Sequence, residues 1–266
     1  MELQTIKTHN GSFCVNPQDL IGNYILRTGV WEPHLEYLYN EFIEKDDTII
    51  DAGANLGYHS VKFGFKAKKV YSFEPQTKVY NLLCQNISLN ELDNVVIPYE
   101  NGLGDKAEKQ QLWSDKHEDF GNGIINYGGR GIIDNHPDSA DKYNSENNPY
   151  NEEDIIKIIF LDSLNIKECH LIKIDVQGYE YKTLKGAEKL IKDNYPVIFL
   201  ESYPESRVYD VKTLQYLKDL NYQIYRSQVG NKDDFILINP NNDRFEDHRD
   251  IINISSLKYP IEEYEG

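Results

Sequence analysis

The chain has 266 residues, of which 39% are hydrophobic and 27% charged, and its formal net charge is −16 at pH 7. This length and composition are typical of one large globular domain, or of one domain with additions. The negative charge argues against DNA, RNA and anionic membrane surfaces as partners, because phosphate binding depends on clustered lysine and arginine. A neutral or cationic small substrate fits better, although acidity that only aids solubility explains the charge equally well.

The cysteines and the N-terminus bear on the compartment. Cys14, Cys84 and Cys169 lie far apart, with no C-x-x-C or Cys/His spacing, which predicts reduced thiols and no metal site. Residues 1–7 lack the apolar core of a signal peptide, and no segment approaches the ~20 apolar residues of a membrane span. We therefore expect a soluble, cytoplasmic protein.

The first half of the chain predicts a lead-in followed by alternating strands and helices. Residues 1–45 form the lead-in, with short strands and one helix that begins at Glu32-Pro33, because proline is tolerated in a first turn. The alternating part comprises strand 47–51, helix 57–66, strand 69–74, helix 77–90 and strand 94–99. Alternation of this kind predicts a parallel, doubly wound α/β sheet.

The regular pattern breaks between residues 105 and 153. Glycines and large apolar residues in 111–133 predict a packed hairpin, and the polar run 134–153 predicts a mobile surface insertion.

Order returns with the apolar run 155–160, which is followed by strand 171–176, helix 180–193, strand 196–201, helix 211–220 and strands near 222–226 and 234–238. The last two strands form a hairpin, which gives the sheet one antiparallel edge. We expect a seven-stranded, mostly parallel sheet with helices on both faces, in a domain of residues 46–240. Residues 241–266 are a polar tail.

A nucleotide pocket is expected where the first strand of the domain ends at Asp51. Gly53 and Gly57 bracket the turn that follows, and glycine lets a ligand approach the backbone. About 20 residues later the next strand ends in Glu74, where an acid can accept hydrogen bonds from both ribose hydroxyls. A turn that binds no ligand is the alternative, and Glu74 argues against it.

The residues of this turn also indicate which nucleotide binds. The turn does not match the dinucleotide fingerprint G-x-G-x-x-G, and Asp51 would repel a pyrophosphate. A ligand with an ammonium and a sulfonium group suits it better, and S-adenosyl-L-methionine is such a ligand.

Four of the expected strands end in or beside acids, Asp51, Glu74, Asp175 and Glu201. Ligands of open α/β sheets bind beyond the carboxyl ends of the strands, so these acids are expected along one rim. Each acid alone could instead be a helix N-cap, which is the interpretation we prefer for Asp162.

Methyl transfer to a hydroxyl needs a positioned acceptor oxygen and a group that takes its proton. Asp175 is the first candidate for the base, or for a group that orients the acceptor, and His59 is the alternative base. Glu180 and Glu201 either position the substrate or cap helices. Tyr58 either contacts the sulfonium through a cation–π interaction or belongs to the core.

Several motifs resemble those of one known family. They are Asp-Ala-Gly-Ala-Asn-Leu-Gly-Tyr-His-Ser (51–60), Ser-Phe-Glu-Pro (72–75), Leu-Asp-Ser-Leu (161–164), Ile-Lys-Ile-Asp-Val-Gln-Gly-Tyr-Glu (172–180) and Leu-Lys-Gly-Ala (184–187). In order and content they resemble the FkbM family of S-adenosylmethionine-dependent methyltransferases. The resemblance implies a class I methyltransferase, Rossmann-like fold. It also implies O-methylation of sugars, glycolipids, lipo-oligosaccharides or macrolide-type natural products.

The resemblance also implies roles for individual residues. Asp51, Gly53, Asn55 and Gly57, with Ala54 and Tyr58 beside them, would hold the methionine moiety. Glu74 and Pro75 would hold the ribose, and Asn101 and Gly102 would lie near the adenine. Glu32 and Glu201 fall where the family tends to keep an acid, and Gln177 replaces its usual glutamate. Phe120, Asn122 and Tyr127 lie in the segment where the family varies, so they are expected to contact the acceptor.

The sequence thus predicts an S-adenosylmethionine-dependent O-methyltransferase that acts on a hydroxyl of a sugar, glycan or similar polyhydroxylated acceptor, with no bound metal. A small natural product is the alternative acceptor. Two other classes stay open: a nicotinamide-dependent oxidoreductase, which the missing third glycine argues against, and a non-catalytic nucleotide-binding module, which Asp175 argues against.

Overall fold

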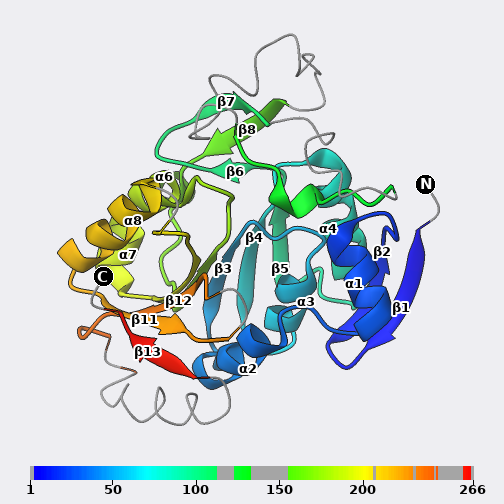
Figure 1. Cartoon of the computed structure of the whole chain (residues 1–266), viewed down its shortest axis with the longest axis horizontal. Coiled ribbons are helices and arrows are strands. Elements are labelled where there is room, and N and C mark those ends of the chain that lie inside the picture. Colours follow the sequence, from blue (N-terminus) through cyan, green and yellow to red (C-terminus); the bar gives the residue numbers. More distant parts are fainter. Residues whose placement is uncertain are drawn as a thin grey trace.

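The computed structural model describes residues 3–112, 123–132, 155–205, 208–229, 232–242, 244 and 260–264. Its centre is an eight-stranded sheet with the order β13-β11-β12-β10-β9-β3-β4-β5 (Figure 1). These strands are β3 (Thr48–Ala52), β4 (Lys69–Phe73), β5 (Val96–Tyr99), β9 (Leu171–Ile174), β10 (Val197–Glu201), β11 (Gln223–Ser227), β12 (Asp234–Ile238) and β13 (Ile261–Glu263).

In this sheet the five neighbouring strands β10-β9-β3-β4-β5 pair in parallel. The pairs β10-β12, β12-β11 and β11-β13 are antiparallel. The expected mostly parallel sheet is therefore confirmed, with one strand more than the sequence predicted. The extra strand, β13, comes from the segment interpreted as a polar tail. This strand has only three residues, of which Ile261 is buried and the two glutamates are exposed. Three residues are too few to show the alternation that identifies a strand in a sequence.

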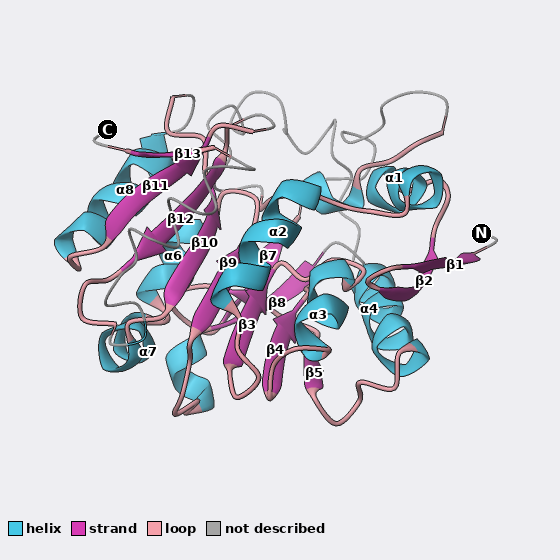
Figure 2. Cartoon of the chain, turned by 90° about the horizontal axis from the view of Figure 1, so that it is seen from below, coloured by secondary structure: helices cyan, strands magenta, loops and turns pink. Residues whose placement is uncertain are grey.

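Helices cover both faces of the sheet. They are α1 (Leu20–Thr28), α2 (Pro33–Phe42), α3 (Tyr58–Gly64), α4 (Thr77–Leu89), α6 (Glu180–Lys185), α7 (Glu188–Asn194) and α8 (Val208–Asp219). Figure 2 shows α2 and α3 lying across one face of the strands. Neighbouring residues of one strand enter different cores: Ile49 packs with α2, α3 and α4, and Ile50 packs with α6, α7 and α8. This is the period-two alternation of a strand that is buried on both faces.

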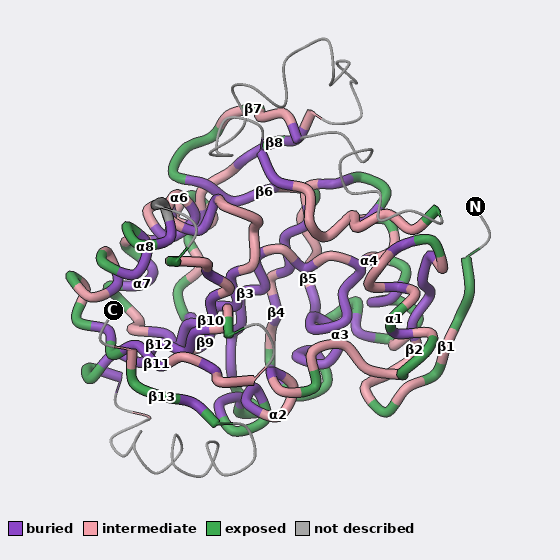
Figure 3. Tube along the Cα trace, in the orientation of Figure 1, coloured by how far each residue is buried: buried purple, intermediate pink, exposed green. Residues whose placement is uncertain are grey.

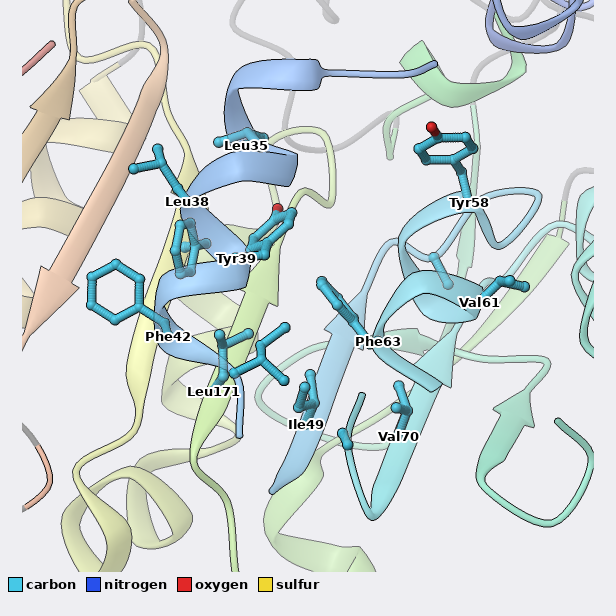
Figure 4. Close-up of a cluster of buried hydrophobic side chains, with 14 of the residues drawn as sticks. Leu35, Leu38, Tyr39, Phe42, Ile49, Tyr58, Val61, Phe63, Val70 and Leu171 are labelled. Carbon is cyan, nitrogen blue, oxygen red and sulfur yellow. The ribbon is translucent and has the colours of Figure 1, made fainter. Parts of the chain in front are cut away.

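Tyr39 lies at the centre of the first core, between α2 and the sheet (Figure 4). Its ring centroid lies 4.9 Å from that of Phe63 and 4.6 Å from that of Phe199. Figure 3 shows the central strands buried and much of β1 exposed. The core therefore extends into the N-terminal 45 residues, because Phe13, Ile25 and Leu38 belong to it as well.

Two smaller sheets complete the described structure. One is the hairpin of β1 (Gln4–Thr8) and β2 (Gly11–Val15), and the other has the order β6-β8-β7 and lies above the main sheet in Figure 1. The strands of this second sheet are β6 (Gly102–Leu103), β7 (Glu108–Gln111) and β8 (Ile155–Ile159).

The expected 111–133 hairpin is described only at its base, where Leu112 pairs antiparallel with Ile132. The described part also contains the short 3₁₀ helix η2 (Tyr127–Gly129). Phe120, Asn122 and the whole 134–153 insertion lie outside the described residues.

The helix expected at 180–193 is divided into α6 and α7. A Cβ on Gly186 would lie 1.8 Å from the carbonyl oxygen of Gly104, so the chain passes β6 too closely for any other residue. Asp162, in the 3₁₀ helix η5 (Leu161–Leu164), accepts hydrogen bonds from the amides of Lys189 and Leu190 at 2.9 Å. Asp162 is therefore a capping residue, as expected, but it caps α7 rather than its own helix.

Two asparagines of α4 hold the N-terminal hairpin against the domain. The fully buried Asn86 accepts a hydrogen bond from the Cys14 amide at 2.6 Å and donates to the carbonyl oxygens of Cys14 and Leu56. Asn90, one turn later, bonds both the amide and the carbonyl of Ser12. These side-chain amides satisfy backbone groups of β2 that would otherwise be buried and unpaired.

Asn86→Ala leaves those backbone groups without a partner and should lower the free energy of unfolding by about 1–3 kcal/mol. Urea denaturation followed by circular dichroism measures it. Asn81→Ala, at an exposed position of the same helix, should change stability by no more than about 0.5 kcal/mol. Equal effects of the two substitutions would contradict the structural role of Asn86.

Candidate active site

A cavity of about 360 Å³ opens at the carboxyl ends of β3, β4, β9 and β10. Most of the residues expected at the site line it: Glu32, Gly53, Ala54, Asn55, Tyr58, His59, Glu74, Pro75, Asn101, Gly102, Asp175 and Glu201. Three of the four strand-end acids, Glu74, Asp175 and Glu201, thus lie at one rim, where open α/β sheets bind their ligands, and Asp51 lies behind it.

The loop from Gly53 to Gly57 forms one wall of the cavity. The amides of Gly53 and Ala54 both donate to the carbonyl oxygen of Phe73, at 3.0 and 2.9 Å, which ties the loop to the end of β4. Gly53 has a φ of +80°, and a Cβ there would lie 1.8 Å from the carbonyl oxygen of Asp175. Glycine is thus required where the loop passes over the end of β9.

Glu74 lies at the other side of this loop and is almost fully buried. Its two carboxyl oxygens accept hydrogen bonds from the amides of Asn55 (3.1 Å) and Gln76 (2.8 Å). Burial raises the pKa of Glu74 to about 7, although these amides and Lys173 oppose the shift. Each oxygen keeps a second lone pair that a ligand hydroxyl can use.

Lys173 is a buried cation among acids. Its Nζ donates to the carbonyl oxygen of Gly53 at 2.9 Å and lies 3.5 Å from Asp175 Oδ2 and 3.6 Å from Asp51 Oδ1. Burial alone would lower the pKa of Lys173, but Asp175, Asp51, Glu32 and Glu201 raise it above its ordinary value. The ammonium group therefore stays charged and joins the loop after β3 to the end of β9.

Asp175 and Glu201 lie at the ends of the neighbouring strands β9 and β10, and both are hydrogen-bonded to Gln177. Gln177 Nε2 lies 2.7 Å from Asp175 Oδ1 and 2.9 Å from Glu201 Oε2, and the Tyr203 hydroxyl donates to Glu201 Oε1 at 2.9 Å. Burial raises the pKa of Asp175, but Lys173 and hydrogen bonds from Glu201 and Gln177 hold it below its ordinary value. Burial, followed by the charge of Asp175, raises the pKa of Glu201 well above its ordinary range. The pKa values of the two carboxyls are thus shifted in opposite directions, and Asp175 is ionised at neutral pH.

The carboxyl of Glu32 and the imidazole of His59 form a second pair at the cavity. Glu32 Oε2 lies 2.8 Å from His59 Nε2, and the buried Nδ1 of His59 has no hydrogen-bond partner. Glu32 has a φ of +47°, which is rare for a residue other than glycine. His59 is poorly placed to act as a base, because its Nε2 is hydrogen-bonded to Glu32 and its Nδ1 is buried in the core. It holds the Glu32 carboxylate in place instead.

Four of the expected residues do not line the cavity. Asp51 is fully buried behind it, where it accepts a hydrogen bond from Ser60 at 2.6 Å. Gly57 is the N-cap residue of α3. Glu180 accepts hydrogen bonds from the amides of Val176 and Gly178. Tyr127 lies on a separate, more apolar groove beside α4.

Tyr58 lines the cavity but is only 2% exposed. Its ring stacks on Phe13 at 4.9 Å, and its hydroxyl accepts from Asn10. This environment matches the alternative interpretation of Tyr58 as a core residue.

Several residues that line the cavity were not predicted as site residues from the sequence, namely Trp31, Arg130, Lys173 and Tyr203. Gln177 also lines it, and the sequence predicted no role of its own for this residue. Lys173 had a readable signal, because it stands two residues before Asp175 on an otherwise apolar strand, where both side chains point to the same side. Tyr203 stands two residues after Glu201 in the same way.

Within the described part of the chain no group of three or more His, Cys, Asp or Glu side chains could hold a metal ion. Among the same residues, no helix has the length and apolar character needed to cross a membrane.

Comparisons with known proteins identify the class of protein. The model of the FkbM methyltransferase domain matches residues 51–224. The crystal structure of methyltransferase FkbM from Methylobacillus flagellatus superposes with a TM-score of 0.51 at 17% identity, over 80% of this chain and 46% of that one. This chain thus corresponds to about half the length of that protein. The likeness confirms the class I methyltransferase fold.

Two curated relatives are similar in sequence. Hexuronic acid methyltransferase AglP of Haloferax volcanii is 24% identical over 208 residues, which are 76% of this chain and 74% of AglP. Methyltransferase sdnD of Sordaria araneosa is 25% identical over 53% of this chain and 60% of its own length. Because the domain model matches more than half of it, the chain belongs to the FkbM methyltransferase family, as the motifs predicted.

The buried carboxyl of Glu180 makes stability depend on pH. Burial raises its pKa to about 7, so the folded protein holds this proton more tightly than the unfolded chain does. Stability is therefore lost as pH rises from about 4.5 to about 7, and Glu180 should account for on the order of 2–3 kcal/mol of that loss. Glu180→Gln, which keeps an acceptor oxygen, should flatten this part of the profile.

Denaturation at a series of pH values measures this dependence. The control is Glu188→Gln on α7, because its two lysine partners lower the pKa of Glu188 to about 2, so its titration lies in the acid range. The control should keep the wild-type slope above about pH 5. A Glu180→Gln profile parallel to the wild-type profile would contradict a raised pKa at Glu180.

Proposed function

We propose that this protein is an S-adenosylmethionine-dependent O-methyltransferase and that its acceptor is a sugar or a similar polyhydroxylated molecule. The observation that carries the proposal is that one cavity joins a nucleotide-type loop and the acid Glu74 to a set of carboxyl groups, Glu32, Asp175 and Glu201. A hydroxylated acceptor would bind at these carboxyls.

The residues of the loop side suit the cofactor. A cavity of about 360 Å³ falls in the size range of small-molecule sites. The loop 53–57 would hold the methionine part, Glu74 the ribose hydroxyls, and Pro75, Asn101 and Gly102 the adenine. When bound, S-adenosylmethionine supplies an electrophilic methyl group, whose bond to sulfur breaks with the electron pair left on sulfur as the acceptor oxygen bonds to its carbon.

The opposite side of the cavity suits a sugar. Carboxyl oxygens accept hydrogen bonds from hydroxyl groups, and the Trp31 ring offers an apolar surface for a sugar ring. Glu32 and Asp175 favour a neutral or cationic acceptor over an anion. The relative AglP, a hexuronic acid methyltransferase, supports a carbohydrate acceptor but not this charge preference, because a hexuronic acid carries a carboxyl group.

Asp175 would receive the acceptor hydroxyl. Its carboxylate is ionised at neutral pH, so it accepts the hydroxyl's hydrogen bond and takes up the proton as the oxygen is methylated. The hydrogen bonds that keep Asp175 ionised also make it a weak base, so much of its effect would come from orienting the acceptor oxygen. Glu32, held by His59, would fix a second hydroxyl.

Isothermal calorimetry with S-adenosylmethionine, S-adenosylhomocysteine and NAD tests the cofactor, and a transfer assay with labelled methyl donor and a panel of methyl glycosides tests the acceptor. Binding of both adenosyl-sulfur compounds together with labelled glycoside supports the proposal. Binding of NAD alone would mean an oxidoreductase. Cofactor binding without transfer to any glycoside would exclude the sugar acceptor.

Glu74→Ala should weaken S-adenosylmethionine binding by about 1.5–3 kcal/mol, because it removes hydrogen bonds to a charged group. Calorimetry measures the dissociation constant, and Glu41→Ala on the exposed side of α2 serves as the control. If the Glu74→Ala protein binds as tightly as the control, the ribose is held elsewhere.

Asp175→Asn keeps the shape of the side chain but removes the proton acceptor. Its kcat should fall by roughly 10²–10⁴-fold, while the affinity for S-adenosylhomocysteine stays within about threefold of wild type. Single-turnover transfer and calorimetry measure the two quantities. A kcat near that of wild type would remove Asp175 from the mechanism.

A further inference from the structure

Gln177 occupies a strained position between two carboxyl groups. Its φ of +53° lies in the left-handed region, which side chains other than glycine, asparagine and aspartate rarely adopt. Such strain persists only where the surrounding contacts determine it, and it gathers at functional sites. The contacts here are to Asp175 and Glu201, which line the cavity with Gln177.

A single nitrogen of Gln177 serves both carboxyls. Nε2 carries two N–H bonds and lies within hydrogen-bond distance of Asp175 Oδ1 and of Glu201 Oε2. An ionised glutamate at this position has no N–H to donate and would add a negative charge beside Asp175. The two carboxyls would then repel one another without a neutral donor between them.

We propose that Gln177 is a positioning residue whose amide group, fixed between Asp175 and Glu201, holds the Asp175 carboxylate ionised and in place to receive the hydroxyl proton of the acceptor. The inference rests on the proposed function for the reaction itself. The hydroxyl proton passes to the Asp175 carboxylate as the oxygen bonds to the methyl carbon, and the sulfur keeps the electrons of the broken bond.

The surroundings favour an ionised Asp175, whereas the hydrogen bond from Tyr203 opposes the rise in the pKa of Glu201. Lys173 donates to the Asp175 side, and the Tyr203 hydroxyl donates to the Glu201 side. The other titratable groups that act on the pair, directly or through Lys173, are Glu32 before α2, Tyr39 on α2, Asp51 on β3, Glu74 after β4, Glu180 on α6 and Asp234 on β12. Of these groups, Asp234 has its own partner, because its Oδ2 lies 2.7 Å from His34 Nε2.

Gln177→Glu tests the proposal by changing charge and donor at nearly constant shape. The control, Gln85→Glu, makes the same change at an exposed position of α4. In ¹³C-labelled protein, NMR titration of the side-chain carboxyls follows Asp175 and Glu201 directly, without an acceptor. We expect the Asp175 midpoint to rise by about one pH unit or more in Gln177→Glu and to stay unchanged in Gln85→Glu. Equal midpoints in the two variants would overturn the proposal.

The pH profile of methyl transfer gives a second readout that a merely structural role would not move. In Gln177→Glu the acid limb of kcat/KM should shift to higher pH by about as much as the Asp175 midpoint does, while kcat/KM near pH 8 stays within about threefold of the wild-type value. A uniform loss at all pH values would overturn the proposal. A wild-type protein that transfers methyl to no glycoside would contradict the proposed function, and the NMR titration would still decide the role of Gln177.

Discussion

The buried ammonium group of Lys173 is the interaction on which the candidate site depends. It bonds the backbone of Gly53 and lies between Asp51 and Asp175, so it joins the loop after β3 to the carboxyl end of β9. A buried charge is stable only when it is paired and hydrogen-bonded. Since Asp51 and Asp175 lie on adjacent strands, the pairing of β3 with β9 and the closeness of these charges support each other.

Backbone strain separates the site from ordinary turns. Among the described residues, the left-handed residues other than glycine include Glu91, Asn165, Tyr195 and Asn221, each at or just after the end of a helix, where this conformation is common. Glu32, Asn55 and Gln177 are different, because all three line the cavity. Their side chains or amides contact Glu74, His59, Asp175 and Glu201. The strain therefore falls where the polar groups of the site need fixed directions.

Much of the fold could be predicted from the sequence because the central strands are short apolar runs that end in acids. Ile49 and Ile50 show why: both are fully buried, one on each face, so the run is continuous rather than alternating. The break at Gly186 could not be predicted, because it depends on the approach of Gly104, which is distant in sequence. The same holds for the hydrogen bond between Glu32 and His59, because these residues are 27 positions apart and meet only through the packing of two separate segments.

The division of the cavity into two electrostatic halves follows from these constraints. On the loop side, backbone amides satisfy Glu74, so this acid can be buried near neutral pH at modest cost. On the acceptor side the acids face one another, and their repulsion must be met by donors. Lys173 supplies one charged donor, and Gln177 and Tyr203 supply neutral ones. A carboxylate at position 177 would place one more negative charge near Asp175 for Lys173 to balance, whereas glutamine donates to both Asp175 and Glu201 and adds no charge.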